Sequence, residues 1–353
     1  MNLPNYLPLA LGLTIFSFFI TSLLMVPFIN LLYKLKFVRQ KEESQKGKTS
    51  LFSKLHRKKA GTPTGGGILV LVTVTTLFTM VFSLASHSGV LIHSAHNLNF
   101  ELFIIFFTFI SFGFLGLSDD IAKIFAKGRG GERALALVYG LSRKQKFALQ
   151  WILAGIIGFL LFKNLGIQIV HIPVFHITLN LGPLYILFAA FVIVFFTNAF
   201  NFTDGLDGLA SGLLLIYLLA FGVIAGTHLD TPLSIFIALW VGSIIAFLYF
   251  NVWPARIFLG DAGAMSFGAM IAVVGLLTGN IAALFVIGGI FVIEAASSAM
   301  QILGWKILKK PFFPIAPIHH TFLAIGWEEP KIVMRAWIAG VILAIFGLWL
   351  ASI

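Results

Sequence analysis

Ten long apolar stretches alternate with polar segments along this chain, and their length is the first guide to its fold. A helix needs about 20 apolar residues to cross the hydrocarbon of a bilayer. By that criterion the pattern predicts an all-α, polytopic integral membrane protein with about ten transmembrane helices, in a single domain over residues 1–353. The predicted spans are 7–33, 65–86, 101–118, 147–165, 183–200, 208–227, 232–250, 262–279, 281–304 and 332–352.

The placement of the basic residues supports this count and orients the chain. Only Thr278-Gly279-Asn280 separates the spans 262–279 and 281–304, so a single fused span is the alternative. Kept apart, they leave every Lys and Arg except Lys163 in odd-numbered loops or at their borders. Because Lys and Arg accumulate in cytoplasmic loops, ten spans put the odd loops in the cytoplasm and both termini outside. Fusing two spans would destroy this partition.

The composition agrees with a membrane protein and excludes some classes of site. The chain is 59% hydrophobic and 10% charged, whereas a soluble domain is about 25% charged. It has no Cys, which excludes disulfides and thiolate metal sites. The net charge of +11 arises in the loops that orient the chain and does not predict a nucleic-acid partner. Residues 39–55, within the most polar segment 39–60, are expected to form a solvated loop attracted to anionic lipid.

Five aspartates gather at the predicted cytoplasmic membrane boundary. Asp119 and Asp120 end the third span, Asp204 and Asp207 lie between the fifth and sixth, and Asp261 opens the eighth. Carboxylates in this position cost desolvation, so they are candidates for function. Such a cluster suits Mg²⁺, which takes one or two carboxylates together with phosphate oxygens. The alternative is helix capping, which fits Asp261 but not a pair at a helix C-terminus, where the dipole opposes negative charge.

Other polar motifs lie on the same side of the membrane. The run NAFNFTDGLDGLASG (198–212) spaces Asn198, Asn201 and two aspartates three residues apart. Its glycines allow close backbone approach to a phosphate, or else a packed helix face. The segment KKAGTPTGGG (58–67) is a weak phosphate-loop signal and equally an ordinary entry to a helix. His319 and His320 can bond a phosphate or transfer a proton, and Glu294 within a span is a further candidate.

Seven segments spread over nearly the whole chain carry a family resemblance. They are KAGTPTGGG (59–67), GLSDDIAK (116–123), GLSRKQKFALQ (140–150), NAFNFTDGLDGLA (198–210), FNVWPARIFLGDAG (250–263), FVIEAASSAMQ (291–301) and PIHHTFLAIGWEEPKIVMRAW (317–337). Together they resemble the polyprenyl-phosphate N-acetylhexosamine-1-phosphate transferase superfamily. The PIHH and GW–EPK features are most similar to its phospho-N-acetylmuramoyl-pentapeptide transferase branch.

The resemblance implies an activity, a cofactor and partners. The expected reaction transfers phospho-MurNAc-pentapeptide from UDP-MurNAc-pentapeptide to undecaprenyl phosphate, giving lipid I and UMP, the first membrane step of peptidoglycan synthesis. The expected cofactor is Mg²⁺, and the expected location is the cell inner membrane, with the active site on the cytoplasmic face. The partners are then the UDP-linked amino-sugar donor, the polyprenyl phosphate acceptor and the bilayer. Relatives often dimerise, so a homodimer is expected as well.

The resemblance also assigns roles to the matching positions. Asp119 and Asp120 belong to the catalytic acidic cluster, with Asp119 the candidate base on the lipid phosphate. Asp261 is the expected main Mg²⁺ ligand, with Asp120 and Asp204 beside it. The expected catalytic set is completed by Lys123, His319 and His320. The expected substrate-binding residues are Lys59, Thr64, Asn198, Asn201, Asp204, Gly205, Leu206, Asp207, Asn251, Phe258, whose ring would stack on uracil, and Gln301.

Departures from the family pattern keep an alternative open. Thr321 and Leu323 replace the third His and the Glu of its histidine motif, and Gly65 replaces a Met. The acids are intact, so catalysis is expected to survive, but recognition of the amino sugar and peptide is open. The alternative is a sister enzyme that uses UDP-GlcNAc or another UDP-HexNAc. A transporter fits less well because its polar sites belong near the bilayer midplane, and a scaffold would not need five acids. Direct attack and a phospho-aspartyl intermediate both remain open.

Overall fold

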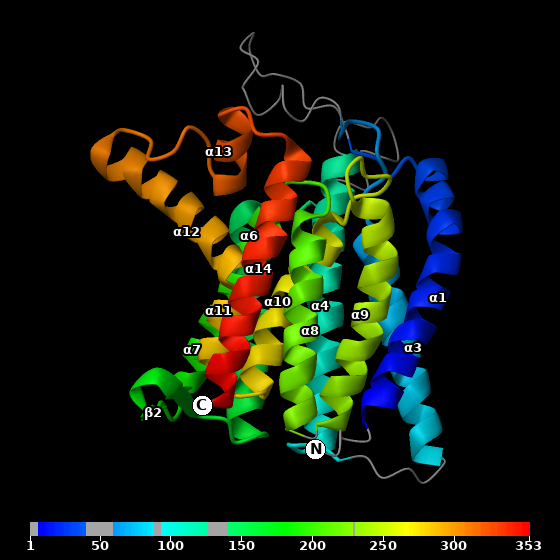
Figure 1. Cartoon of the computed structure of the whole chain (residues 1–353), viewed down its shortest axis with the longest axis vertical. Coiled ribbons are helices and arrows are strands. Elements are labelled where there is room, and N and C mark those ends of the chain that lie inside the picture. The colour runs from blue at the N-terminus through cyan, green and yellow to red at the C-terminus, as the bar shows by residue number, and fades with distance from the viewer. Residues whose placement is uncertain (1–5, 40–58, 88–92, 126–139, 229) are drawn as a thin grey trace.

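The computed structural model describes residues 6–39, 59–87, 93–125, 140–228 and 230–353. Within these residues ten helices are long and apolar enough to cross a membrane, which confirms the predicted architecture. The described chain begins and ends at the same end of the bundle (Figure 1). The ten helices are α1 (Tyr6–Lys34), α3 (Gly66–His87), α4 (Leu98–Phe125), α6 (Arg143–Lys163), α7 (Leu184–Thr203), α8 (Leu209–Thr227), α9 (Thr231–Asn251), α10 (Gly260–Leu277), α12 (Gly289–Leu303, extended by a π turn at Gly304–Leu308) and α14 (Glu329–Ser352).

The separation of the eighth and ninth spans is confirmed, but the ninth differs from its prediction. The stretch 281–304 is divided between α11 (Ile281–Ile287) and α12, which meet at Gly288. A Cβ at Gly288 would lie 2.8 Å from the carbonyl oxygen of Leu284, so only glycine fits this tight junction. Beyond it α12 tilts away from the bundle (Figure 1).

The third span is longer than the pattern predicted. The apolar stretch predicts a span that ends at residue 118, but α4 continues to Phe125. The placement of Asp119 and Asp120 at a helix C-terminus is therefore wrong, and both lie inside the final turns of α4. The helix can continue through them because their side chains find partners on α6 and α10, described below.

Helix α10 lies at the centre of the bundle. Its residues from Ala262 to Leu277 are buried, and α3, α4 and α7 pack around it. Glycines bring two of these helices unusually close to its first turn. A Cβ on Gly67 of α3 would lie 2.3 Å from the Cα of Gly263, and one on Gly116 of α4 would lie 2.0 Å from the carbonyl oxygen of Asp261. Backbone contacts therefore hold Asp261 in place.

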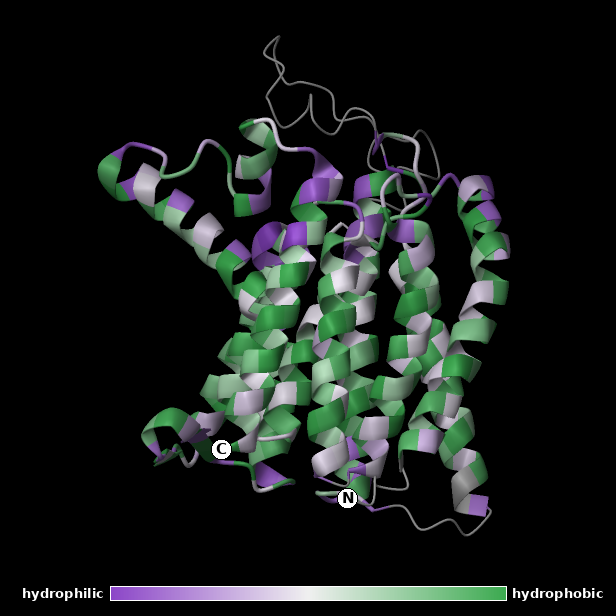
Figure 2. Cartoon of the chain, in the orientation of Figure 1, coloured by the Kyte–Doolittle hydropathy of each residue, from purple (hydrophilic) through white to green (hydrophobic). Residues whose placement is uncertain are grey.

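The two ends of the bundle differ in polarity and in their loops. Hydrophilic residues are concentrated at the end that carries the short helix α13 (Ile318–Ala324) (Figure 2). The opposite end carries an antiparallel hairpin of β1 (Ile169–Ile172) and β2 (Ile177–Asn180), joined by a 3-10 turn. The pattern did not predict these strands because each is only four residues long. The expected solvated loop lies outside the described residues except for Arg39, since the structure does not describe residues 40–58.

Candidate active site

A cavity of about 420 Å³ opens at the polar end of the bundle. The end of α4, the α7–α8 turn and the start of α10 contribute to its walls, so segments far apart in the sequence converge there. Eleven of the predicted site residues line it, together with three others that the prediction did not include. The lining consists of Arg39, Lys59, Thr64, Asp120, Lys123, Ile124, Asp204, Gly205, Leu206, Asp207, Asn251, Phe258, Gly260 and Asp261.

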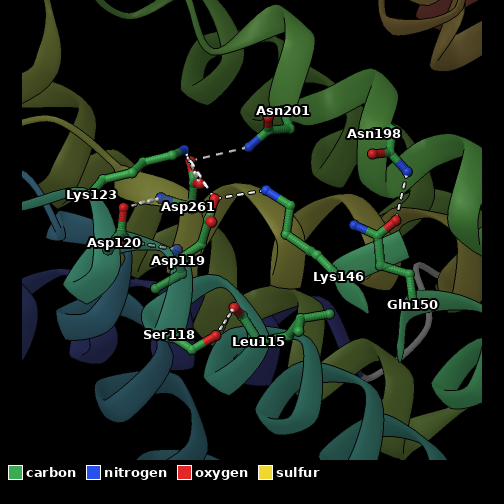
Figure 3. A network of polar contacts seen from close by, with 11 residues as sticks. Leu115, Ser118, Asp119, Asp120, Lys123, Lys146, Gln150, Asn198, Asn201 and Asp261 are labelled. Atoms are coloured by element: carbon green, nitrogen blue, oxygen red, sulfur yellow. Dashed lines mark hydrogen bonds and ion pairs between the residues drawn. The ribbon is translucent and has the colours of Figure 1, made fainter. Parts of the chain in front are cut away.

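One wall of the cavity is an acid corner formed by α4, α6 and α10 (Figure 3). Asp119 Oδ2 lies 3.0 Å from Lys123 Nζ and 2.7 Å from Lys146 Nζ. Lys123 Nζ also donates to Asp261, so one ammonium joins two carboxylates. Asn201 Nδ2 lies 3.4 Å from Asp261 Oδ1. Asp119 does not line the cavity itself, but Lys123 connects it to the residues that do.

Asp120 bonds the backbone of α10, whereas Asp119 bonds lysine side chains. Its Oδ1 accepts a hydrogen bond from the backbone N–H of Asp261 and its Oδ2 accepts one from that of Ala262, both at 3.0 Å. The residue that precedes α10, Leu259, offers no side-chain cap. Asp120 therefore caps α10 from another helix, where the dipole favours its negative charge. Our rejection of capping for the Asp119–Asp120 pair is wrong for Asp120, because the capped helix is distant in sequence.

A second wall of the cavity is supported by a buried ion cluster of Lys59, Asp207 and Glu329. Lys59 Nζ lies 2.7 Å from Asp207 Oδ1 and 2.5 Å from Glu329 Oε1. Glu329 Oε1 also accepts from the backbone N–H of Asp207 at 2.6 Å, and Asp207 Oδ2 accepts from that of Ala255 at 3.0 Å. The cluster thus ties the first loop, the α7–α8 turn, the α9–α10 loop and α14 together.

Asp204 also lines the cavity, in the turn after α7. Burial raises its pKa to about 7, and the charge of Asp261 adds to this effect, while Arg39 and Lys59 oppose it. A bound cation would favour the ionised form of such a carboxyl group.

Phe258 and Thr64 line the cavity through a backbone pairing of their loops. Phe258 O accepts hydrogen bonds from the N–H groups of Gly65 and Gly66, at 3.1 and 2.8 Å. The Arg39 guanidinium lies 5.8 Å from the centre of the Phe258 ring. The aromatic side chain is therefore held at the cavity with a cation nearby.

Asn251 is a lining residue whose amide is occupied by the protein. Its Oδ1 accepts from Ser211 Oγ at 2.6 Å and from the Gly208 N–H at 3.2 Å. Its Nδ2 donates to the Ile257 carbonyl oxygen at 2.9 Å. These bonds connect the start of α8 to the α9–α10 loop, so the amide shapes the cavity wall.

Some predicted residues lie outside the cavity lining. Asn198 Nδ2 donates to Gln150 Oε1 at 2.9 Å, to one side of the acid corner (Figure 3). Gln301 bonds the backbone of Phe312 and Phe313. His319 and His320 are buried in α13, behind the lining residues.

Sequence reasoning missed three charged partners of the site. Lys146 and Glu329 pair with predicted aspartates, and Arg39 lines the cavity. Lys146 and Glu329 each lie in the first turn of a span, within the family motifs at 140–150 and 317–337. A charged residue in such a motif at the membrane boundary could have been predicted to belong to the site. Arg39 had no comparable signal, since it is one of many basic residues in its loop.

The ligand atoms that the acid corner offers are carboxylate oxygens, which Mg²⁺ prefers. Among the described residues, no three His, Asp or Glu side chains converge into a ready-made metal cage. Mg²⁺ does not require one, because it keeps several waters and shares its ligands with phosphates. The residues present therefore fit an ion that is completed by a phosphate substrate.

Comparison with known proteins agrees with this arrangement. Residues 102–279 match the model of glycosyl transferase family 4. Proteins named phospho-N-acetylmuramoyl-pentapeptide-transferase are similar along nearly the whole chain. One from a Geobacillus species is 35% identical, covering 95% of this chain and 96% of its own. One from Bacillus velezensis is 34% identical with 96% of both chains covered, and one from Clostridium perfringens is 37% identical with 90% of both covered. The chain therefore belongs to the phospho-N-acetylmuramoyl-pentapeptide-transferase family, within glycosyl transferase family 4.

Proposed function

We propose that this enzyme transfers phospho-MurNAc-pentapeptide from UDP-MurNAc-pentapeptide to undecaprenyl phosphate, releasing UMP. The observation that carries the proposal is the cavity at the membrane boundary, where four of the five predicted aspartates meet Lys123 and Phe258. A site at this boundary can take a water-soluble nucleotide sugar and the phosphate of a lipid at the same time. The relatives named for this activity support it over the UDP-GlcNAc alternative.

The chemistry exchanges one phosphoanhydride for another. An oxygen of the lipid phosphate attacks the β-phosphorus of the donor, and the bond from that phosphorus to the UMP oxygen breaks. The demand on the protein is then mainly positioning and charge neutralisation. Lys123 and Arg39 supply positive charge at the cavity, and Phe258 offers a ring face for the uracil. Asp119 does not line the cavity, so it would act on the acceptor phosphate through Lys123, the lysine that it shares with Asp261.

Mg²⁺ is the proposed cofactor, with Asp261, Asp204 and Asp120 as its protein ligands. The ion would neutralise charge on the donor's phosphates and on the leaving group. Asp120 accepts a hydrogen bond from the backbone N–H of Asp261, so Asp120 positions Asp261 in addition to contributing charge. Lys123 holds the Asp261 carboxylate at the cavity wall.

The test measures UMP release by purified protein in detergent. The protein is incubated with Mg²⁺, undecaprenyl phosphate and either UDP-MurNAc-pentapeptide or UDP-GlcNAc. UMP from the muramoyl donor, abolished by Asp261→Asn or by EDTA and restored by Mg²⁺ in the wild type, is the expected result. UMP from UDP-GlcNAc alone would assign the protein to the sister activity, and no UMP from either donor would refute the proposal.

The same proposal places the enzyme in the inner (cytoplasmic) membrane, with the cavity facing the cytoplasm. The basic odd-numbered loops support that orientation. A homodimer stays a prediction that rests on the family resemblance.

A further inference from the structure

One face of α12 carries a stripe of polar side chains that hydrogen-bond the loop before α13 and the start of α13. Glu294, Ser297 and Gln301 follow one another at three- and four-residue intervals, so they share a face. Ser297 Oγ accepts from the backbone N–H of Ile318 at 3.0 Å. Gln301 Oε1 accepts from those of Phe312 and Phe313, at 3.0 and 2.9 Å. The outward-tilted α12 therefore determines where α13 sits.

Glu294 is the charged member of this stripe and is 4% exposed. Its Oε2 lies 2.9 Å from His319 Nδ1 and 3.5 Å from the backbone nitrogen of the same residue. A carboxylate buried in a membrane-spanning helix is costly unless it is paired. The pairing of Glu294 with one imidazole nitrogen leaves the other nitrogen, Nε2, to face elsewhere.

His319 Nε2 faces the α7–α8 turn that forms part of the cavity wall. The residue is 1% exposed, and Nε2 has no hydrogen-bond partner among the described residues. A Cβ on Gly205 would lie 2.4 Å from it, so the imidazole edge touches the glycine backbone. Gly205 itself lines the cavity. A buried polar atom without a partner is rare in proteins, and this one lies directly behind the donor cavity.

We propose that Glu294 is a positioning residue that orients His319 toward the nucleotide-sugar donor. By accepting the Nδ1–H bond, Glu294 fixes the imidazole so that Nε2 is an acceptor at Gly205, where a hydroxyl group of the donor substrate donates a hydrogen bond to it. A hydrogen bond to one ring nitrogen is what sets the role of the other. This inference rests on the proposed function, since it supplies the donor.

A purely structural role for Glu294 makes a different prediction. In that case Glu294 would stabilise α13 through the backbone nitrogen of His319, and the effect of its removal would not depend on the side chain at position 319. A double-mutant cycle separates the two roles, because residues that act through one another are not additive. His319→Asn suits the cycle, since its amide can still donate to Glu294 while the atom equivalent to Nε2 is gone.

The experiment compares Glu294→Leu and Glu294→Gln in the wild-type and His319→Asn backgrounds, with kcat and the donor and acceptor KM as readouts. Glu294→Leu is expected to lower kcat/KM for the donor roughly tenfold, the scale of a lost orienting partner, with the acceptor KM unchanged. Glu294→Gln keeps an acceptor oxygen and is expected to retain most of the activity. In the His319→Asn background, Glu294→Leu is expected to cost no further activity.

Ser297→Ala is the matched control on the same helix face. It removes the cap on Ile318 and is expected to lower the melting temperature, with the same fractional effect on activity in both backgrounds. If Glu294→Leu behaves in this additive way too, its role is structural and the proposal is wrong.

A second readout needs no turnover. In an NMR spectrum of protein with ¹⁵N-labelled histidine, the signal that disappears in His319→Asn belongs to His319. That signal reports which ring nitrogen of His319 carries a proton. It is expected to show a proton on Nδ1 in the wild type and a changed pattern in Glu294→Leu. An unchanged pattern would overturn the orienting role. Absence of UMP release by the wild type would instead refute the proposed function, and the labelled signal would then decide whether Glu294 orients His319.

Discussion

The acid corner and the ion cluster both pair a lysine with two carboxylates, but the two lysines differ in how much of the side chain is exposed. In the acid corner, the Lys123 side chain is 60% exposed and the ammonium bridges Asp119 and Asp261. In the ion cluster, Lys59 is 7% exposed, and it is enclosed by Asp207 and Glu329. An exposed ion pair contributes little stability and can exchange partners, whereas a buried charge left alone is strongly destabilising. The acid corner is thus suited to chemistry and the ion cluster to holding the loops together.

The largest expected effect comes from removing the charge of Asp261. Asp261→Asn keeps the side-chain shape and the α10 contacts, so the melting temperature should stay near that of the wild type. UMP release is expected to fall about a thousandfold, because the metal site and the transition-state charge balance are lost together. A variant that folds normally and retains a tenth of the activity would contradict the assignment of Asp261 as the main ligand.

Lys59→Met tests the ion cluster. It leaves two buried carboxylates without their cation, which is expected to lower the free energy of unfolding by about 3–5 kcal/mol. Thermal unfolding in detergent measures the change. Adding Glu329→Gln to Lys59→Met removes one of the unpaired charges and is expected to recover part of the loss. Equal stability of the single and double variants would show that the cluster does not hold the loops.

Lys123→Met is the counterpart in the acid corner. Because this lysine is mostly exposed, the stability change is expected to stay below about 1 kcal/mol. Activity is expected to fall about 10–100-fold, since Asp261 loses the partner that orients it. A stability loss as large as that of Lys59→Met would remove the distinction between the two walls.

The smallest effect on activity is expected from the packing that supports the acid corner. Gly116→Ala puts a Cβ 2.0 Å from the Asp261 carbonyl oxygen, so α4 and α10 must separate at a cost of about 1–3 kcal/mol. Gly155→Ala is the control, because nothing lies within 4 Å of its added Cβ. Thermal unfolding and UMP release should both fall in the first variant and stay unchanged in the second.

Much of the fold was predictable because its signals are local. The length of each apolar stretch and the sign of the charges between stretches depend on neighbouring residues alone, and they were enough to predict ten spans. The family motifs were also legible from short runs of sequence, including the aspartates that meet at the cavity. The hairpin of β1 and β2 was missed because four-residue strands give too short a pattern.

The partners of the charged residues were not predictable from the chain alone. Asp119 and Asp120 are neighbours in sequence, yet one meets the lysines of α4 and α6 while the other caps α10. Glu329 bonds Lys59, which is 270 positions away in the sequence. Glu294 bonds His319, which lies on the short helix α13. The sequence by itself therefore determined the number of spans, the side on which the basic residues gather and the residue types of the site. Tertiary structure alone decided which acid neutralises which lysine, because that choice depends on helix packing that brings distant residues within hydrogen-bonding distance.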